Sequence, residues 1–463
     1  MGILLTGGIV VTAADTYPAD VRLEGEKITA IGRNIAQDGD EPVNVAGCFL
    51  FPGGIDPHTH FDLPIGDMRT ADSFASGSKA ALIGGTTTII DYATQFKGES
   101  LGTGLTNWHA LARDNCYTDY GFHMAITDWN DTIAREMKEL VEEHGISSFK
   151  LYMAYKNVLQ VDDGALLSAF RAAAGCGAIL CLHCENGDVI DTLVRQSIRQ
   201  GRTEPRYHAV SRPALVEEEA TRRAILLAQM ADAPLYVVHL TCAGALTAVE
   251  EAKRAGLPVY AETCPQYLLL DESYYEQAGF ESAKYVISPP LRNRANQPVL
   301  WQGLTNHMLD TVATDHCSFH FSGQKDLGLH DFSKIPNGMP GVETRLSLLY
   351  TYGVAGGRIN LNQFVALTAT NAAKVFGLYP RKGTIAVGSD ADITVWDPCY
   401  EGIISAQTQA QRVDYSPFEG FVQKGRAKYV YLRGRLAAGE GQLIASQAEG
   451  QYLQRSPFRT GIL

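Results

Sequence analysis

The chain of 463 residues is 45% hydrophobic and 19% charged, with a formal net charge of −12 at pH 7. This composition is typical of a compact globular protein and argues against a disordered or fibrous chain. The acidic balance and the lack of a Lys/Arg run predict no nucleic-acid partner. No stretch approaches the roughly 20 apolar residues that span a bilayer, and no basic residue precedes Arg22, so we expect neither a membrane segment nor a secretory signal.

The cysteines indicate a reducing environment. There are nine, an odd number scattered along the chain, which suits free thiols in the cytoplasm better than a disulfide framework. Cys181 and Cys184 have the CxxC spacing of zinc and redox sites, but no second pair accompanies them. We expect both to be small buried side chains.

Residues 1–52 predict short alternating strands with almost no helix, as in ILLTGGIVV and KITAIGRNI. Residues 380–437 have the same character, as in ADITVWD and AKYVYLRGR. We predict that both ends build one small β-sandwich domain, interrupted by the rest of the chain. Residues 438–463 are polar and rich in small residues, and both a packed strap and a disordered terminus remain open for them.

Residues 53–379 alternate strand-like and helical runs and form the predicted catalytic domain. Eight strand-like runs end in polar or ionisable residues: GGIDPHTHF, TTTIIDYA, DYGFHMAI, SSFKLYMAY, AILCLHCEN, PLYVVHLT, PVYAETCP and DTVATDHC. This order implies parallel strands joined by crossover helices, so the predicted fold class is α/β, a (β/α)8 TIM barrel. A doubly wound open sheet is the second candidate.

Ionisable residues gather at the carboxyl ends of these predicted strands, where barrel enzymes carry their chemistry. They are His58 and His60 after the first strand, Lys150 after the fourth, His183 after the fifth, His239 after the sixth, and Asp315 with His316 after the eighth. A lone histidine is more often a packed residue than a ligand. Four histidines with a carboxylate, however, are the ligands that zinc and similar divalent ions prefer, and their number favours two ions.

Lys150 does not fit a metal site as an ammonium, because it has no lone pair and would be repelled by the ions. If burial lowers its pKa, the neutral amine can take up carbon dioxide and become a carbamate that bridges two ions. Alternatively, Lys150 turns away from the site or pairs with Glu185 or Asp315. The residues by themselves leave both possibilities open.

A series of motifs covers nearly the whole chain: PGGIDPHTHFD, GGTTTIIDYA, SSFKLYMAYKN, HCEN, APLYVVHLT, ETCPQYLLLD, ISPPLR, ATDHC, NGMPGVETR and KGTIAVGSDADITVWDP. Their order and spacing resemble the dihydropyrimidinase and D-hydantoinase branch of the cyclic amidohydrolases. The resemblance implies a TIM barrel with a β-sandwich, a homotetramer, and two divalent ions per subunit, zinc or else manganese or cobalt. The implied ligands are His58, His60, carboxylated Lys150 (N6-carboxylysine), His183, His239 and Asp315.

The resemblance also implies roles around the substrate. Tyr155 would donate its phenol to the oxygen of the attacked carbonyl, and Ser288 and Asn337 would hold the cyclic amide through backbone groups. Asp315 would shuttle the proton, and Cys317 would line the pocket. A simpler interpretation remains for three of them, with Tyr155 as a strand-end residue and Ser288 and Asn337 as turn residues.

The implied reaction is hydrolysis of 5-substituted hydantoins or dihydropyrimidines to N-carbamoyl amino acids. Dihydroorotase relatives carry an arginine two residues after the second histidine to bind a substrate carboxylate, whereas this chain has Asp62, which disfavours an acidic substrate. Nearby apolar residues favour a hydrophobic or hydrogen substituent: Leu63, Pro64, Ile65, Tyr152 and Leu159. Two alternatives remain, an allantoinase-like enzyme and a non-catalytic dihydropyrimidinase-like scaffold protein. The scaffold would have lost the metal ligands, all of which this chain retains.

Overall fold

The computed structural model describes residues 2–463 and contains an eight-stranded parallel barrel that is nearly closed. The barrel strands are β8 (Gly54–Thr59), β11 (Thr86–Thr94), β12 (Asp119–Ala125), β13 (Ser148–Tyr152), β14 (Ile179–His183), β15 (Leu235–Val237), β16 (Val259–Thr263) and β17 (Thr311–Val312). Every residue of these strands is buried, as expected for a parallel sheet covered on both faces. The predicted α/β barrel is confirmed, and the open sheet is wrong.

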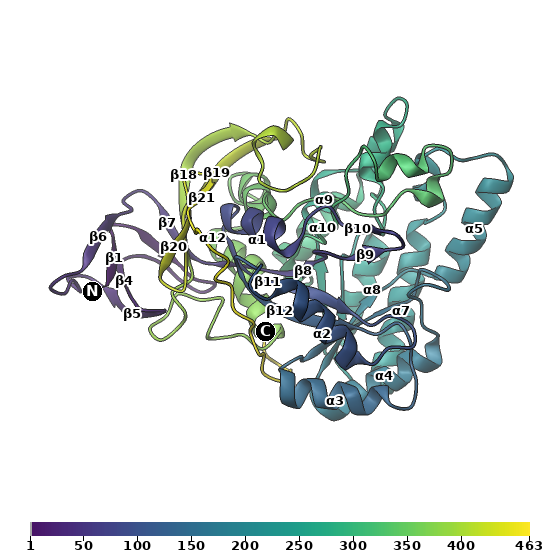
Figure 1. Cartoon of the computed structure of the whole chain (residues 1–463), viewed down its shortest axis with the longest axis horizontal. Coiled ribbons are helices and arrows are strands. Elements are labelled where there is room, and N and C mark those ends of the chain that lie inside the picture. Colours follow the sequence, from purple (N-terminus) through teal and green to yellow (C-terminus); the bar gives the residue numbers. More distant parts are fainter. Residues whose placement is uncertain (1) are drawn as a thin grey trace.

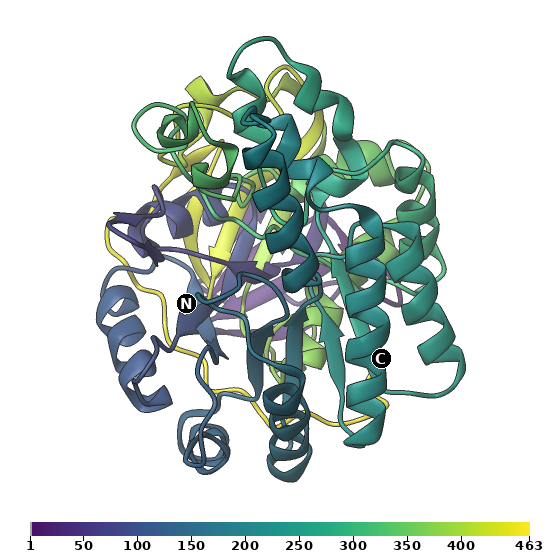
Figure 2. The ribbon, with the colours of Figure 1, turned by 90° about the vertical axis from the view of Figure 1, so that its right-hand side faces the viewer.

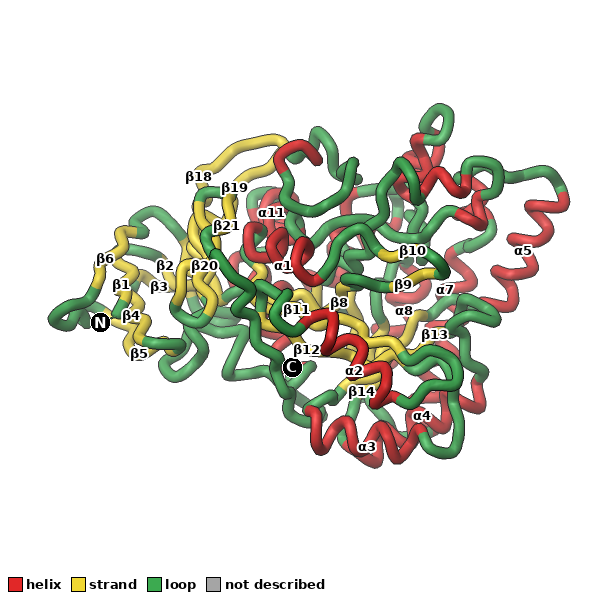
Figure 3. Tube along the Cα trace, in the orientation of Figure 1, coloured by secondary structure: helices red, strands yellow, loops and turns green. Residues whose placement is uncertain are grey.

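Helices surround the barrel, as the red coils around the yellow strands in Figure 3 show. The longer helices are α1 (Phe74–Ile83), α2 (Leu101–Ala112), α3 (Ile133–His144), α4 (Asp163–Cys176), α5 (Gly187–Arg199), α7 (Ala214–Met230), α8 (Ala243–Arg254) and α10 (Asn296–Thr305). The short ones are α6 (Arg206–Val210), α9 (Pro265–Leu269), α11 (Arg345–Leu349), α12 (Leu361–Val365) and α13 (Asn371–Val375). Local sequence sets several starts; for example, the Asp162 side chain caps α4 by accepting the N–H of Ala165 at 2.8 Å. None of the described helices combines the length and apolarity needed to cross a membrane.

The gap between β8 and β17 is bridged by buried side chains. The guanidinium of Arg345 donates to the carbonyl of Ile55 in β8 at 2.8 Å and to that of Val312 in β17 at 2.9 Å. Asp56 accepts the hydroxyl of Thr314 at 2.6 Å across the same gap. These bonds stand in for a regular ladder, and they fix the two strands that lead to the predicted ligands.

Both ends of the chain form two further mixed sheets, at the left of Figure 1. One sheet has the order β5-β4-β1-β6, with β1 (Ile3–Thr6), β4 (Asp20–Glu24), β5 (Lys27–Gly32) and β6 (Glu41–Asn44). The other has the order β21-β20-β19-β18-β7-β2-β3, with β2 (Ile9–Val11), β3 (Thr16–Pro18), β7 (Phe49–Pro52), β18 (Ile393–Ile403), β19 (Val422–Leu432), β20 (Arg435–Gly439) and β21 (Gln442–Leu443). Val21, Ile28, Ile393 and Val395 belong to one buried core that joins the two ends. The domain boundaries 1–52, 53–379, 380–437 and 438–463 stay a prediction.

The C-terminal tail is an extended strap, seen as the yellow trace in Figure 2. The N–H of Tyr120 in β12 donates to the carbonyl of Gln451 at 3.0 Å, and the N–H of Arg455 donates to that of Gly145, just before β13, at 3.0 Å. The Arg455 side chain is buried and donates to the hydroxyl of Ser148 at 2.9 Å. The strap therefore lies at the starts of the barrel strands, away from the ends that carry the predicted ligands.

Candidate active site

The predicted histidines and Asp315 lie together at the carboxyl ends of the barrel strands. The ring centroid of His58 is 5.2 Å from that of His60 and 5.4 Å from that of His239, and the rings of His183 and His239 are 4.7 Å apart. Asp315 Oδ1 is 3.1 Å from Nε2 of both His58 and His60. Ligand atoms of His58, His60 and Asp315 all lie within 4.8 Å of one another and form a metal-binding site.

The hydrogen bonds of His58 show that this cluster suits a cation. Nδ1 of His58 donates to the buried carboxylate of Glu262, so in the neutral ring the lone pair is on Nε2, 3.1 Å from Asp315 Oδ1. Two acceptors this close repel each other unless positive charge lies between them. Burial lowers the pKa of His58, but the Glu262 and Asp315 carboxylates outweigh it and raise the pKa to about 9. A divalent cation can replace that proton.

The other histidines present neutral rings. Burial lowers the pKa of His60, His183 and His239 below the ordinary value. His183 donates through Nε2 to Glu185 at 2.8 Å, and its Nδ1 lies 3.0 Å from Nε2 of His239. Nδ1 of both His60 and His239 is buried without a hydrogen-bond partner among residues 2–463. Neutral imidazoles with free nitrogens are the ligands that zinc and similar ions take.

Lys150, in β13, is fully buried beside this cluster. Burial lowers its pKa to about 8. Its Nζ lies 5.1 Å from the ring centroid of Tyr92 and 5.3 Å from that of Tyr152. Within the described part of the chain Lys150 forms no ion pair, so the expected alternatives of pairing with Glu185 or Asp315 are not found. A buried amine with this pKa is partly neutral near pH 8, as carbamate formation requires.

Three residues of the site have a left-handed backbone. The angle φ is 66° at Tyr155, 39° at His239 and 52° at Asp315. This conformation costs about 1–3 kcal/mol at a residue other than glycine and persists only where the surrounding structure imposes it. The fold therefore fixes the direction of these side chains. No local feature of the sequence predicted the left-handed backbone at these residues.

Ser288 and Asn337 lie on two neighbouring loops, which are joined where the N–H of Gly338 donates to the carbonyl of Val286 at 3.0 Å. Within residues 2–463, the carbonyl of Ser288 and the N–H of Asn337 take part in no hydrogen bond. The Ser288 hydroxyl is likewise buried without a partner. Both loops thus offer free polar groups to a ligand.

Tyr155 links the metal-binding site to a cavity. Its ring centroid is 5.1 Å from that of His183, and with Asn337 it lines a cavity of about 260 Å³. Burial raises the pKa of Tyr155, so its phenol stays a hydrogen-bond donor near neutral pH. The structure therefore brings Tyr155 and Asn337 to one cavity next to a predicted ligand.

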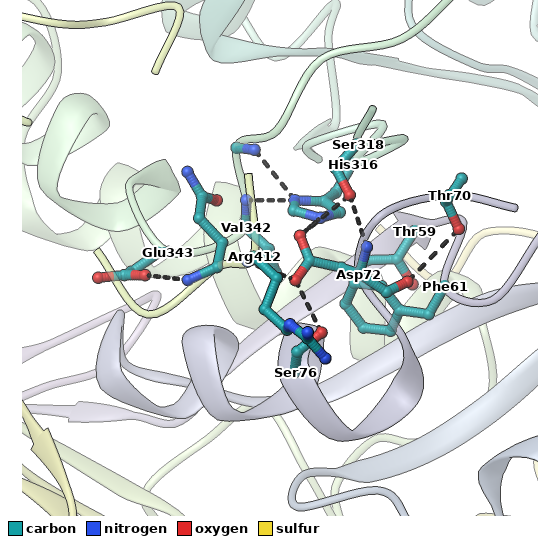
Figure 4. A network of polar contacts seen from close by, with 12 residues as sticks. Thr59, Phe61, Thr70, Asp72, Ser76, His316, Ser318, Val342, Glu343 and Arg412 are labelled. Carbon is teal, nitrogen blue, oxygen red and sulfur yellow. Dashed lines mark hydrogen bonds and ion pairs between the residues drawn. The ribbon is translucent and has the colours of Figure 1, made fainter. Parts of the chain in front are cut away.

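His316, although adjacent to Asp315, is committed to a buried network with Asp72 (Figure 4). Its Nε2 donates to Asp72 at 3.0 Å, and its Nδ1 accepts the N–H of Gly341 at 3.0 Å. Asp72 also accepts the backbone N–H of Arg412 at 2.8 Å. Both ring nitrogens of His316 are thus occupied, so it anchors the segment after β17 rather than binding a metal.

Two carboxylates that orient the predicted ligands, Glu262 and Glu185, were not predicted in this role; Glu185 was considered only as a partner of Lys150. Glu262, in β16, binds His58 and also accepts the backbone N–H of His239 at 3.1 Å. Glu185 holds His183 in the same way. The available signal for Glu262 was its place near the carboxyl end of a predicted barrel strand, in PVYAETCP.

Residues 49–437 match the Amidohydrolase family. The chain belongs to this family. It is 49% identical to the D-hydantoinase of Geobacillus stearothermophilus, over 98% of this chain and 97% of that protein. It is 41% identical to the dihydropyrimidinase of Rattus norvegicus, over 98% of this chain and 89% of that protein.

The crystal structure of dihydropyrimidinase from Brevibacillus agri matches this amidohydrolase with a TM-score of 0.98 at 49% identity, over 99% of this chain and 100% of that one. These similarities extend over nearly the whole chain. They confirm the predicted branch of D-hydantoinases and dihydropyrimidinases and a metal-dependent cyclic amidohydrolase.

Proposed function

We propose that this amidohydrolase opens the cyclic amide of 5-substituted hydantoins and dihydropyrimidines to give N-carbamoyl amino acids. The observation that carries the proposal is the metal-binding site beside the free backbone groups of Ser288 and Asn337. The relatives named D-hydantoinase and dihydropyrimidinase support this substrate class.

The proposed cofactor is a pair of divalent ions, zinc or else manganese or cobalt. The residues that would hold them are His58, His60, Lys150, His183, His239 and Asp315. When bound, such ions supply Lewis acidity and lower the pKa of water to near neutrality. Nδ1 of His60 and Nδ1 of His239, which have no hydrogen-bond partner among residues 2–463, support this set.

Lys150 would join the set as a carbamate. Its neutral amine adds to the carbon of carbon dioxide and loses a proton, which leaves a carboxylate on Nζ. Its complete burial and its pKa of about 8 support this modification, because both favour the neutral amine. The carboxylate would then supply oxygen ligands that the ammonium lacks.

The remaining residues would bind the ring and move the proton. The Ser288 carbonyl would accept a ring N–H, the Asn337 N–H would donate to a ring carbonyl, and the Tyr155 phenol would stabilise the oxyanion of the attacked carbonyl. Asp315 would take the proton of the attacking water and deliver it to the ring nitrogen as the C–N bond breaks. The product carries a new carboxylate and a free ureido group.

Asp62 supports a substrate without a carboxylate. Its side chain accepts the N–H of Phe74, the first residue of α1, at 2.8 Å. Asp62 therefore places a negative charge at this position and binds the N-terminus of α1. A site for a substrate carboxylate would need a cation here instead. The adjoining hairpin consists of β9 (Pro64–Ile65) and β10 (Met68–Arg69). Its Ile65 is 36% exposed and would cover an apolar substituent of the ring.

A homotetramer in the cytoplasm is part of the proposal. All nine cysteines are free thiols, which suits a reducing compartment. Light scattering on the purified protein measures the number of subunits.

A substrate panel tests the function. Metal-loaded protein is assayed with phenylhydantoin, dihydrouracil and allantoin, with metal content measured on the same sample and chiral analysis of the products. We expect turnover of at least one of the first two, with carbamoyl amino acid as product. Turnover of allantoin alone, or of none of them at full metal content, overturns the proposal.

A further inference from the structure

Lys325 is a second fully buried lysine, outside the metal-binding site. Among residues 2–463 it has no carboxylate within ion-pair distance, and its Nζ donates to the carbonyls of Val286 and Pro336, both at 3.0 Å. Burial lowers its pKa to about 7. Burying an amine without a counter-ion costs free energy that a methionine of similar length would not. The hydrogen bonds to these two carbonyls are therefore the contribution that an amine makes at this position and a methionine would not.

These acceptors lie on the two loops proposed to hold the substrate ring. Val286 is two residues before Ser288, and Pro336 directly precedes Asn337. The Lys325 Nζ thus bridges both loops. It is a second link between them, in addition to the hydrogen bond from the Gly338 N–H to the Val286 carbonyl.

The loop around Ser288 is held on both sides of a single free carbonyl. Three further side chains bind its backbone: Tyr275 donates to the Tyr285 carbonyl at 3.0 Å, His208 to the Ile287 carbonyl at 2.6 Å, and Tyr267 to the Pro289 carbonyl at 2.9 Å. With the Lys325 bond, every carbonyl from 285 to 289 except that of Ser288 accepts a hydrogen bond in the described structure. Among the carbonyls from 285 to 289, the loop therefore presents that of Ser288 unpaired and in a fixed position.

The loop around Asn337 is anchored to the barrel. Gly338 packs so closely on the backbone carbonyl of Cys317 that a Cβ would overlap it, and the N–H of Cys317 donates to the Met339 carbonyl at 3.1 Å. Cys317 is two residues from Asp315. Lys325 therefore connects the Ser288 loop to the Asn337 loop, which is itself attached to the segment that carries Asp315.

We propose that Lys325 is a positioning residue that sets the distance between the Ser288 carbonyl and the Asn337 N–H, and thereby aligns the substrate ring with the metal-binding site. This inference rests on the proposed function, because both ring contacts belong to that proposal. An amine donates two hydrogen bonds in either protonation state, so the bridge does not need the charge. If the two loops move apart, the ring can no longer form both hydrogen bonds at once, so substrate binding weakens.

The test compares Lys325→Met with the wild type and with Lys253→Met, using dihydrouracil and phenylhydantoin. Lys253 donates to both oxygens of Asp310, at 2.8 and 2.7 Å, near the start of β17. Both variants lose a lysine that donates two hydrogen bonds; Lys253 is partly buried, and only Lys325 contacts the ring loops. For Lys325→Met we expect KM to rise about tenfold or more with kcat within about threefold and metal content unchanged, because ground-state binding is lost. For Lys253→Met we expect lower thermal stability and an unchanged KM.

Lys325→Gln keeps N–H donors on a shorter side chain, so its KM should fall between those of the wild type and Lys325→Met. It also carries the test if the methionine variant does not fold. An unchanged KM in a folded, metal-loaded variant overturns the positioning role, as does failure of both variants to fold, which would make Lys325 a requirement of the fold itself. A wild type that hydrolyses neither compound refutes the proposed function instead.

Discussion

Glu262 and His58 are joined by a buried hydrogen bond between a carboxylate oxygen and Nδ1, and the other ring nitrogen of His58 faces Asp315 Oδ1 at 3.1 Å. The carboxylate thereby selects the tautomer whose Nε2 is free to bind a metal. The same oxygen of Glu262 accepts the backbone N–H of His239 at 3.1 Å. One carboxylate therefore orients two predicted ligands.

Replacing this carboxylate should weaken metal binding. We expect Glu262→Gln to lower metal affinity by about 10–100-fold, because the amide is a poorer acceptor for the His58 N–H. Metal content after dialysis against graded chelator measures the loss, and excess metal should restore activity. Glu250→Gln is the control, since Glu250 pairs with Arg254 along α8 away from the site. Equal metal retention by both variants would contradict the orienting role.

The proton shuttle can be tested at Asp315. An amide cannot take up the proton, so Asp315→Asn should lower kcat by about 100-fold to 10,000-fold. Part of the metal should remain, because the histidine ligands are unchanged. Turnover and metal content are measured on the same preparation. Near-normal kcat would remove Asp315 from this role.

Closure of the barrel depends on Arg345. Arg345→Met removes the two hydrogen bonds that the guanidinium donates to the carbonyls of Ile55 in β8 and Val312 in β17. It also leaves the buried Asp56, 3.9 Å from the guanidinium, without its cation. We expect a loss of about 3–5 kcal/mol in unfolding free energy, as for other broken buried pairs. The midpoint of urea unfolding measures it. Arg358→Met, at an exposed position, should cost less than about 1 kcal/mol. Similar midpoints for the two variants would be evidence against this closure.

Glu343 should make stability fall as pH rises. Its partly buried carboxyl accepts the N–H groups of Ala410 at 2.7 Å and Gln411 at 3.2 Å, and desolvation raises its pKa from 4.5 to about 7. Between these values the folded protein keeps a proton that the unfolded chain releases, so this group's contribution to stability declines from about pH 4.5 to about pH 7.

Glu343→Gln keeps the acceptor oxygen and removes the charge. Its melting temperature should match that of the wild type near pH 4.5 and exceed it above pH 7, where the folded wild type carries a partly desolvated carboxylate. Thermal unfolding at a series of pH values compares the two proteins. A variant that is less stable than the wild type at high pH would contradict the sign of this linkage.

The sequence predicted the barrel because its strands and helices are encoded locally. GGIDPHTHF contains β8, and DTVATDHC contains β17, as expected from apolar runs that end in polar residues. The bridge between them could not be predicted in this way. Arg345 and Ile55 are 290 positions apart, and nothing near either residue shows that they meet.

In the candidate site, too, the sequence predicted some features and only the folded structure showed others. Histidines and Asp315 at strand ends indicated a metal, since parallel strands bring their carboxyl ends to one face. His316 has the same residue type and neighbourhood as a ligand, yet Asp72 and Gly341 occupy both of its nitrogens. Residue type and strand position did not distinguish these two outcomes.

The sequence by itself determined the alternation of strands and helices, the residue types at the mouth of the barrel and, through its motifs, the branch of the family. Tertiary structure decided which nitrogen of His58 faces Asp315, that Lys150 forms no ion pair within the described residues, and that Lys325 joins the Ser288 and Asn337 loops. The physical reason is range: periodicity and capping act over a few residues. Tautomers, pKa values and loop spacing depend on burial and hydrogen bonds between segments that only the folded chain brings together.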